Sequence, residues 1–216
     1  MARTSEEKTV DRLLALYLIN ECYQSYHLRG LSETKLQKLV FLSEKKLIDN
    51  RIKAFNYRFV KLLHPSYSSE LNSDLTHFVK SKYLNEPWFR QTRKMRLVLE
   101  DFSEVFSRNR HVLSLIDDVL SQRARNRTDF LVNMVFHMPW RMTRYGMQTI
   151  EDLKIGTPLL YPLSHEKAHE TFKITEEELE NLEICLNPQI SRDLDKAFNE
   201  MRRGKMLSHE EVFGDL

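Results

Sequence analysis

The stretch from Leu31 to Leu84 constrains the fold of this chain most, because it contains three local signals one after the other. The first is a helix that Ser32 can cap and that ends near Asp49. Its apolar residues recur at helical spacing, at Leu36, Leu39, Val40 and Leu47. One face of this helix is therefore expected to be buried.

The second signal is a short strand, in which Phe55, Tyr57 and Phe59 alternate with polar residues. The third is a turn at His64-Pro65, because proline pushes the preceding residue into an extended conformation, and a second helix that Ser66 can cap. The predicted core of the whole unit consists of Leu36, Leu39, Phe59, Leu71, Leu75 and Phe78.

The helix before this unit starts with Thr4 and Glu7 at capping-box spacing and is apolar over more than half its circumference, so it should lie near the middle of the fold. We expect it to end between His27 and Gly30, with Gly30 in the left-handed conformation. After the unit, Met95, Leu97 and Leu99 alternate with other residues and predict a second strand. That strand could pair with residues 55–62.

Further helices are predicted over residues 103–120, after Thr128, and after Thr175 with Glu178 at capping-box spacing. The predicted fold class is therefore α+β and mostly α-helical, with a small two-stranded antiparallel sheet and a helical C-terminal extension. Gly and Pro residues between 141 and 162 suggest a boundary. We expect a helical domain over 5–140, a connecting segment with an acidic helix over 141–187, and a helical tail over 188–216.

Composition narrows the functional classes. A net charge of +2 excludes a strongly basic surface overall, so any contact with nucleic acid must come from a local patch. Cys22 and Cys185 lie in apolar-periodic segments and are expected to be buried thiols. No apolar run approaches the roughly 20 residues of a membrane-spanning helix, so a cytoplasmic protein without membrane contact is expected. No glycine-rich phosphate loop or nucleophile elbow is present, and no cofactor is expected.

Three segments in order resemble the Panacea antitoxin domain. They are KLQKLVFLSEK at 35–45, FNYRFVKLLHPSYSSELNSDL at 55–75, and FHMPW at 136–140. The family pattern has Gly before the proline, where this chain has His64. The motif residues carried over are Leu36, Gln37, Lys38, Leu39, His64, Pro65, Ser68, Leu71, His137 and Trp140. From the residues alone, His137 and Trp140 are expected to serve packing.

The resemblance implies an antitoxin, a non-enzymatic protein that neutralises a cognate protein toxin by direct contact. Operator DNA and a second copy of the chain are further partners to consider. The tail also resembles the ends of small antitoxins, and its apolar stripe is the expected partner-binding element. This stripe consists of Leu194, Phe198, Met201, Leu207, Val212, Phe213 and Leu216. The alternative is that the stripe docks on its own domain or on a second copy.

Two other functions stay open at this level. His165, Glu166 and His169 satisfy the H-E-x-x-H pattern of zinc peptidases, in which two histidines one helical turn apart bind the metal. The polar residues around them favour a solvated segment without metal. The cations Arg90, Arg93, Lys94 and Arg96 on the expected second strand would suit the wing of a winged-helix DNA-binding regulator. Acidic residues interleaved nearby favour an ordinary solvated face.

Overall fold

The computed structural model describes residues 3–63, 65–144 and 146–187. Within these ranges the chain forms eight α-helices and four separate two-stranded sheets, which confirms the mostly helical α+β fold. The helices are α1 (Ser5–Gln24), α2 (Glu33–Asp49), α3 (Ser69–Lys80), α4 (Arg93–Asp101), α5 (Ser103–Arg108), α6 (Arg110–Arg123), α7 (Thr128–Phe136) and α8 (Glu176–Leu186). The strands are β1 (Ile52–Lys53), β2 (Phe59–Val60), β3 (Leu84–Asn85), β4 (Arg90–Gln91), β5 (Pro139–Thr143), β6 (Gly146–Thr149), β7 (Pro158–Leu160) and β8 (Glu170–Thr171).

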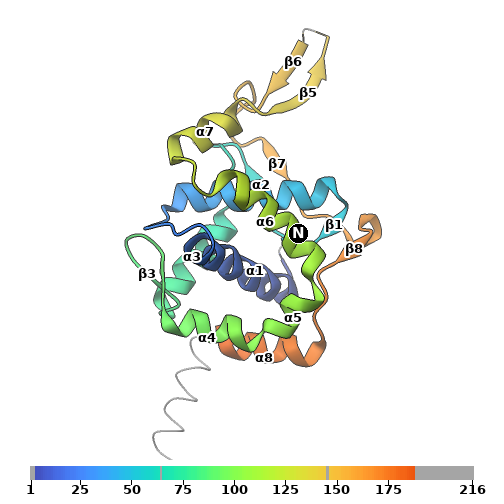
Figure 1. The fold of residues 1–216 in the computed structure, drawn as a ribbon. Helices are drawn as coiled ribbons and strands as arrows, with labels where there is room; N and C mark the ends of the chain where they lie inside the picture. Colours follow the sequence, from blue (N-terminus) through green and yellow to red (C-terminus); the bar gives the residue numbers. More distant parts are fainter. Residues whose placement is uncertain (1–2, 64, 145, 188–216) are drawn as a thin grey trace, which may run out of the picture.

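Helix α1 lies at the centre, with other helices on several sides of it (Figure 1). Leu13, Leu14, Leu16 and Leu18 point in different directions around its axis and are all fully buried. The helix begins with the predicted capping box, in which Thr4 and Glu7 satisfy each other's backbone N–H groups. The predictions of its capping box and of its central position are therefore confirmed.

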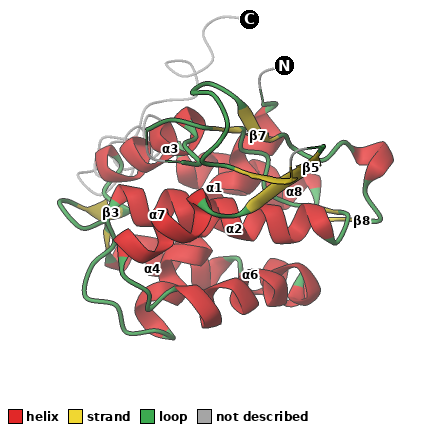
Figure 2. Ribbon diagram, turned by 90° about the horizontal axis from the view of Figure 1, so that it is seen from above, coloured by secondary structure: helices red, strands yellow, loops and turns green. Residues whose placement is uncertain are grey.

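Helix α2 packs across α6 and α7, and Ser32 caps it as predicted, accepting a hydrogen bond from the Lys35 backbone N–H at 3.2 Å. The six residues predicted to form one core are all buried in a single apolar cluster, together with the thiol of Cys22. The thiol of Cys185 is only half-buried, at the edge of that cluster. In Figure 2 the helices form the body and the strands lie around them.

The predicted strand over residues 55–59 is wrong in its extent. Residues 52–57 are all buried, so both faces of this stretch are covered, and within residues 52–60 only the two ends, β1 and β2, pair with other strands. Between the two ends, side-chain carboxylates accept the backbone hydrogen bonds that a neighbouring strand would otherwise accept. The Asn56 backbone N–H donates to Asp11 Oδ1 at 2.7 Å, and the Arg58 backbone N–H donates to Glu70 Oε2 at 2.9 Å. The segment is an irregular buried crossing.

The predicted strand over residues 95–99 is also wrong, because these residues belong to helix α4. Met95, Val98 and Leu99 are the buried ones, at helical spacing, whereas Leu97 is exposed. The Thr92 side chain caps the helix by accepting from the Met95 N–H at 3.3 Å. The expected pairing therefore does not exist: β2 pairs with β7 in antiparallel fashion and β1 pairs with β8 in parallel.

Two predicted helix ends are displaced. Helix α3 is capped by Ser68 rather than Ser66, and Ser66 has a left-handed backbone with φ of 57°. At the end of α1, His27 takes the left-handed conformation in place of Gly30. Glycine at position 30 serves close packing instead, because a Cβ there would lie 3.0 Å from the Cβ of Trp88.

The segment after α7 begins with the β5–β6 hairpin, which projects from the body (Figure 1), and then returns to it. Strands β7 and β8 pair with β2 and β1, and α8 packs against α1. Thr175 and Glu178 form the predicted capping box of α8, which ends at Leu186. In the ranges described, no helix is long and apolar enough to cross a bilayer.

A buried ionic network joins α1 to α3. The Arg3 guanidinium donates to Asp11 at 2.7 Å and to Asp74 at 3.0 Å, and Arg12 donates to Asp74 at 2.8 Å. Burial raises the pKa of the Asp11 carboxyl group to about 7, against the opposing effect of Arg3. The Tyr57 hydroxyl group also donates to Asp74, so this network ties the crossing segment to both helices.

Glu44 lies in α2 close to this network but is not part of it. The residue is fully buried, and neither carboxyl oxygen has a hydrogen-bond partner among the residues described. Burial raises its pKa well above the ordinary value, and the charges of Asp11 and Glu70 add to the effect. Burial therefore favours the neutral form of the Glu44 carboxyl group over the charged form.

Candidate functional site

Two of the three motif segments are joined by side-chain hydrogen bonds. The Gln37 amide of α2 donates to the Ser68 carbonyl oxygen at 2.9 Å and accepts from the Ser68 backbone N–H at 2.9 Å. The Lys38 ammonium donates to the Ser66 carbonyl oxygen at 3.2 Å. Because the Ser68 hydroxyl group also caps α3, the pair Gln37-Lys38 fixes the loop that positions α3.

The remaining residues of these two segments serve the core. Leu36, Leu39, Pro65 and Leu71 are buried, whereas His64 lies outside the described residues. The hydrogen bonds of Gln37 and Lys38 to Ser66 and Ser68 therefore hold the loop in place, and we call them the clamp. The apolar residues of the same two segments pack into the core.

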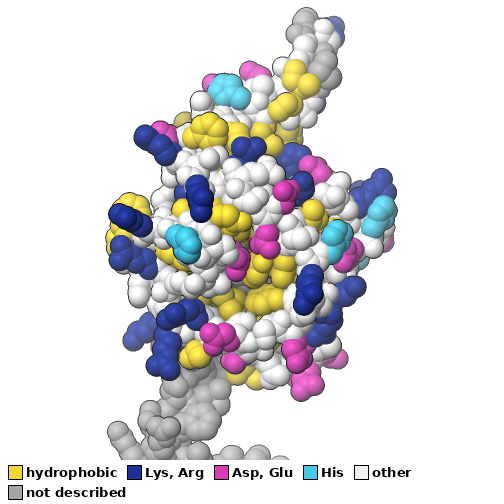
Figure 3. All heavy atoms as spheres, in the orientation of Figure 1, with side chains coloured by type: hydrophobic (Ala, Val, Ile, Leu, Met, Phe, Trp, Pro, Cys, Tyr) yellow, Lys and Arg dark blue, Asp and Glu magenta, His cyan; other side chains and the backbone are white. Residues whose placement is uncertain are grey.

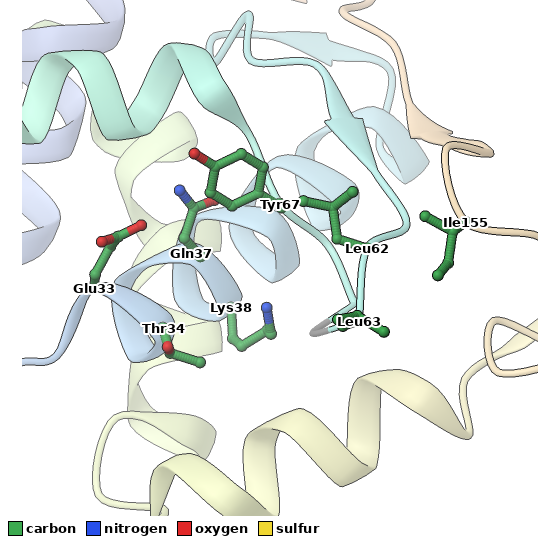
Figure 4. Close-up of a pocket in the computed structure, with 8 residues that line it drawn as sticks. All are labelled: Glu33, Thr34, Gln37, Lys38, Leu62, Leu63, Tyr67 and Ile155. Carbon is green, nitrogen blue, oxygen red and sulfur yellow. The ribbon is translucent and has the colours of Figure 1, made fainter.

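A hollow of about 550 Å³ lies beside the clamp, between α2, the loop that follows β2, and a segment ahead of β7 (Figure 4). We call it the motif groove. It is lined by Glu33, Thr34, Gln37, Lys38, Leu62, Leu63, Tyr67 and Ile155. Leu63 is 79% exposed and Ile155 is 62% exposed, so the rim is apolar and open to solvent. A rim of this kind is typical of a surface that binds a partner.

The floor of the motif groove contains a buried cation. Lys38 is 1% exposed, and the Ser66 carbonyl oxygen is the acceptor recorded for its ammonium group. Burial lowers the pKa of Lys38 to about 8, partly offset by the charge of Glu33. Among the residues described, no carboxylate lies within ion-pairing distance of this ammonium group.

The apolar surface continues on both sides of the motif groove. One neighbouring hollow shares Thr34 with it and contains Phe130, which is 54% exposed. The other shares Leu62 and Tyr67 and contains Tyr161, which is 64% exposed. Both of these hollows therefore adjoin the motif groove.

The third motif segment lies at the end of α7 and does not line the motif groove. Trp140 is half-buried against the core, which confirms its packing role. His137 is exposed instead: its Nδ1 lies 2.8 Å from the Asn133 carbonyl oxygen and its Nε2 3.6 Å from a Glu151 carboxylate oxygen. The packing role predicted for His137 is therefore wrong, because this residue follows the last turn of α7 and is exposed.

The four cations considered for DNA binding lie on β4 and α4, not on one strand. Arg90, Arg93 and Arg96 are exposed. The Lys94 ammonium lies 4.5 Å from the centre of the Tyr83 ring. On the face seen in Figure 3, acidic side chains lie among the lysines and arginines.

The two histidines of the H-E-x-x-H pattern do not lie on an α-helix. Residues 165–167 form a short 3-10 helix, and Ala168 has an extended backbone. His169 Nε2 lies 3.0 Å from the Arg51 guanidinium group, and both histidines are exposed. In the part of the chain that the structure covers, no group of three or more His, Cys, Asp or Glu residues could hold a metal ion.

The apolar stripe predicted to bind a partner, from Leu194 to Leu216, lies outside the described residues. The motif groove was not predicted from the sequence beyond Gln37 and Lys38. The pair Leu62-Leu63, two apolar residues just before the turn, was an available signal, whereas nothing local marks Ile155. Comparison of the chain with protein-family models, curated proteins and solved structures gives no match.

Proposed function

We propose that this chain is an antitoxin that neutralises a protein toxin by direct contact, as its resemblance to Panacea antitoxin domains implies. The observation that supports the proposal is the meeting of two motif segments at one place. Gln37 and Lys38 from the first hold Ser66 and Ser68 from the second, and the clamp borders an apolar groove with an exposed rim. Such a surface suits the binding of another protein.

The tail over residues 188–216 is proposed as a second point of contact with the toxin. Its sequence alternates apolar residues, such as Phe198 and Phe213, with charged ones, and a partner surface would cover the apolar stripe. An antitoxin that binds through both a groove and a tail gains affinity, because the second contact forms at high effective concentration.

Co-expression with the product of the adjacent gene tests the proposal. We expect the neighbouring reading frame to encode a protein that arrests growth, and this chain to restore growth and to co-purify with that protein. An unrelated toxin expressed at the same level is the control. A neighbouring protein that is harmless, or a toxin that neither binds nor is neutralised, would refute the antitoxin function.

Truncation after Asn187 tests the tail separately. A shortened protein that keeps its melting temperature and monomeric size but no longer restores growth identifies the tail as a toxin contact. A shortened protein that aggregates or melts much earlier shows that the tail packs against its own domain.

Operator DNA is a second candidate partner, because Arg90 on the β3–β4 hairpin and Arg93 and Arg96 at the start of α4 are exposed close together in the chain. Phosphate contacts would make binding to the upstream promoter fragment weaken steeply with salt. The triple variant Arg90→Ala, Arg93→Ala, Arg96→Ala should lower the slope of log K against log salt. Equal binding by wild type and variant would exclude this surface.

A further inference from the structure

We propose that the motif groove receives an apolar segment of the partner toxin and that the Lys38 ammonium binds a carboxylate carried by that segment. The inference rests on the proposed antitoxin function, since the toxin is the partner. It assigns a surface, a recognition residue and a chemical character to that contact.

The need for an anion follows from the state of Lys38. An ammonium group has three N–H donors, and among the residues described one acceptor lies within hydrogen-bond distance of them, the Ser66 carbonyl oxygen. The side chain is removed from water, and a buried charge is costly unless it is paired. A carboxylate entering the groove would supply both the missing acceptors and the opposite charge.

The acid already present in the groove does not fill this role. Glu33 is the acidic residue in the lining, and in Figure 4 its side chain leaves α2 in a different direction from that of Lys38, which extends toward Leu63. The two residues are five positions apart on the helix, outside the three- and four-residue spacings at which helical side chains meet. The cation of the groove is therefore left for an external group.

The apolar part of the occupant follows from the rim. Leu63 and Ile155 present exposed side chains beside Lys38, and Tyr161 and Phe130 continue the exposed apolar surface in the adjoining hollows. This surface is broader than a small carboxylic acid would cover. A protein segment with apolar residues on either side of an Asp or Glu matches both features, and aromatic anchors are typical of interface centres.

The test uses the full chain and the toxin encoded by the adjacent gene, with affinity measured by calorimetry. Leu63→Asp and Ile155→Asp place charges at exposed positions, so folding should be preserved while the dissociation constant rises at least about tenfold. Leu97→Asp is the matched control, since Leu97 is 47% exposed on α4 and is absent from the groove lining. We expect it to bind the toxin like the wild type.

Lys38→Met tests the carboxylate contact, with circular dichroism to verify the fold. We expect the dissociation constant to rise at least about tenfold. In a double-mutant cycle, each acidic residue of the toxin is replaced by Asn or Gln, and for one of them the replacement should weaken binding to the wild type but not to Lys38→Met. If Lys38→Met does not fold, the cycle is run with Leu63→Asp instead. The acidic residue that contacts Lys38 should then be the one whose replacement and Leu63→Asp have non-additive effects on the binding free energy.

The outcomes separate the two levels of the proposal. A wild-type chain that does not bind the toxin overturns both the antitoxin function and this inference. A chain that binds the toxin equally well with Leu63→Asp or Ile155→Asp keeps the antitoxin function and overturns the groove. If Leu63→Asp converts a dimer to a monomer without changing toxin affinity, the groove serves a second copy and the inference is wrong.

Discussion

Glu44→Met is expected to stabilise the protein, although it removes a charged residue. Neither oxygen of the Glu44 carboxyl group has a hydrogen-bond partner among the described residues, and the side chain is fully buried. A buried polar group left unpaired costs about 1 to 3 kcal/mol. Methionine has a similar length and no such group, so the free energy of unfolding should rise by about that amount near pH 4.5, where little of the pH-dependent contribution is present. For a chain of this size, the melting temperature should rise by roughly 2 to 12 °C.

The gain should depend on pH in a defined direction. Burial raises the pKa of Glu44 in the folded protein above its value in the unfolded chain. Between those two values the folded state binds more protons, so wild-type stability is highest below the unfolded pKa of about 4.3 and falls as pH rises. Methionine binds no proton. The stability difference between variant and wild type should therefore be smallest near pH 4.5 and largest near pH 8.

Urea denaturation of both proteins at pH 4.5, 6 and 8 measures this difference. Gln37→Met is the control, since Gln37 is equally buried on the same helix but makes both hydrogen bonds to Ser68. It should lose about 1 to 3 kcal/mol. A Glu44→Met protein that is no more stable than wild type at pH 8, or a gain that is the same at all three pH values, would refute the reasoning.

Two further predictions test the core and the metal hypothesis. Leu71→Ala should lower the free energy of unfolding by about 2 to 5 kcal/mol, because Leu71 of α3 is fully buried in the apolar core, and an unchanged melting temperature would contradict that packing. Dialysed protein should contain no stoichiometric zinc by metal analysis, since His165 and His169 are exposed and lie off any α-helix. One zinc per chain that is lost in His165→Ala would instead support a metal site.

The helices with a cap in the sequence were the most predictable part of the fold. Thr4, Ser32 and Thr175 each bind a backbone N–H three residues later, an interaction that depends on neighbouring residues only. The α+β class and the central position of α1 followed from the same local patterns. At α3 the predicted N-cap, Ser66, lies two residues before the observed one, Ser68. Both serines were suitable from the sequence, and the hydrogen bond from Gln37 favours Ser68.

The strands were poorly predicted because their surroundings come from distant parts of the chain. Residues 54–57 are covered on both faces, so Asn56 is buried against Asp11 although it alternates with aromatic residues. In residues 95–99, the apolar pattern fits a strand and a helix alike, and the Thr92 cap decides for the helix.

The motif groove depends on long-range arrangement in the same way. Gln37 and Lys38 were singled out from the sequence, but their partners in the lining come from two other segments. Ile155 is separated from Lys38 by more than a hundred residues, and no periodicity marks it. Recognising the groove required the fold.

The central position of α1 has a consequence during synthesis. This helix leaves the ribosome before the other described helices, yet α8, which covers part of it, is the last of them. About 160 residues separate Gln24 from Leu186, which take roughly 8 to 30 s to translate at about 5 to 20 residues per second. During that time the apolar surface of α1 lacks its final cover. The nascent chain is therefore expected to engage chaperones until α8 has emerged.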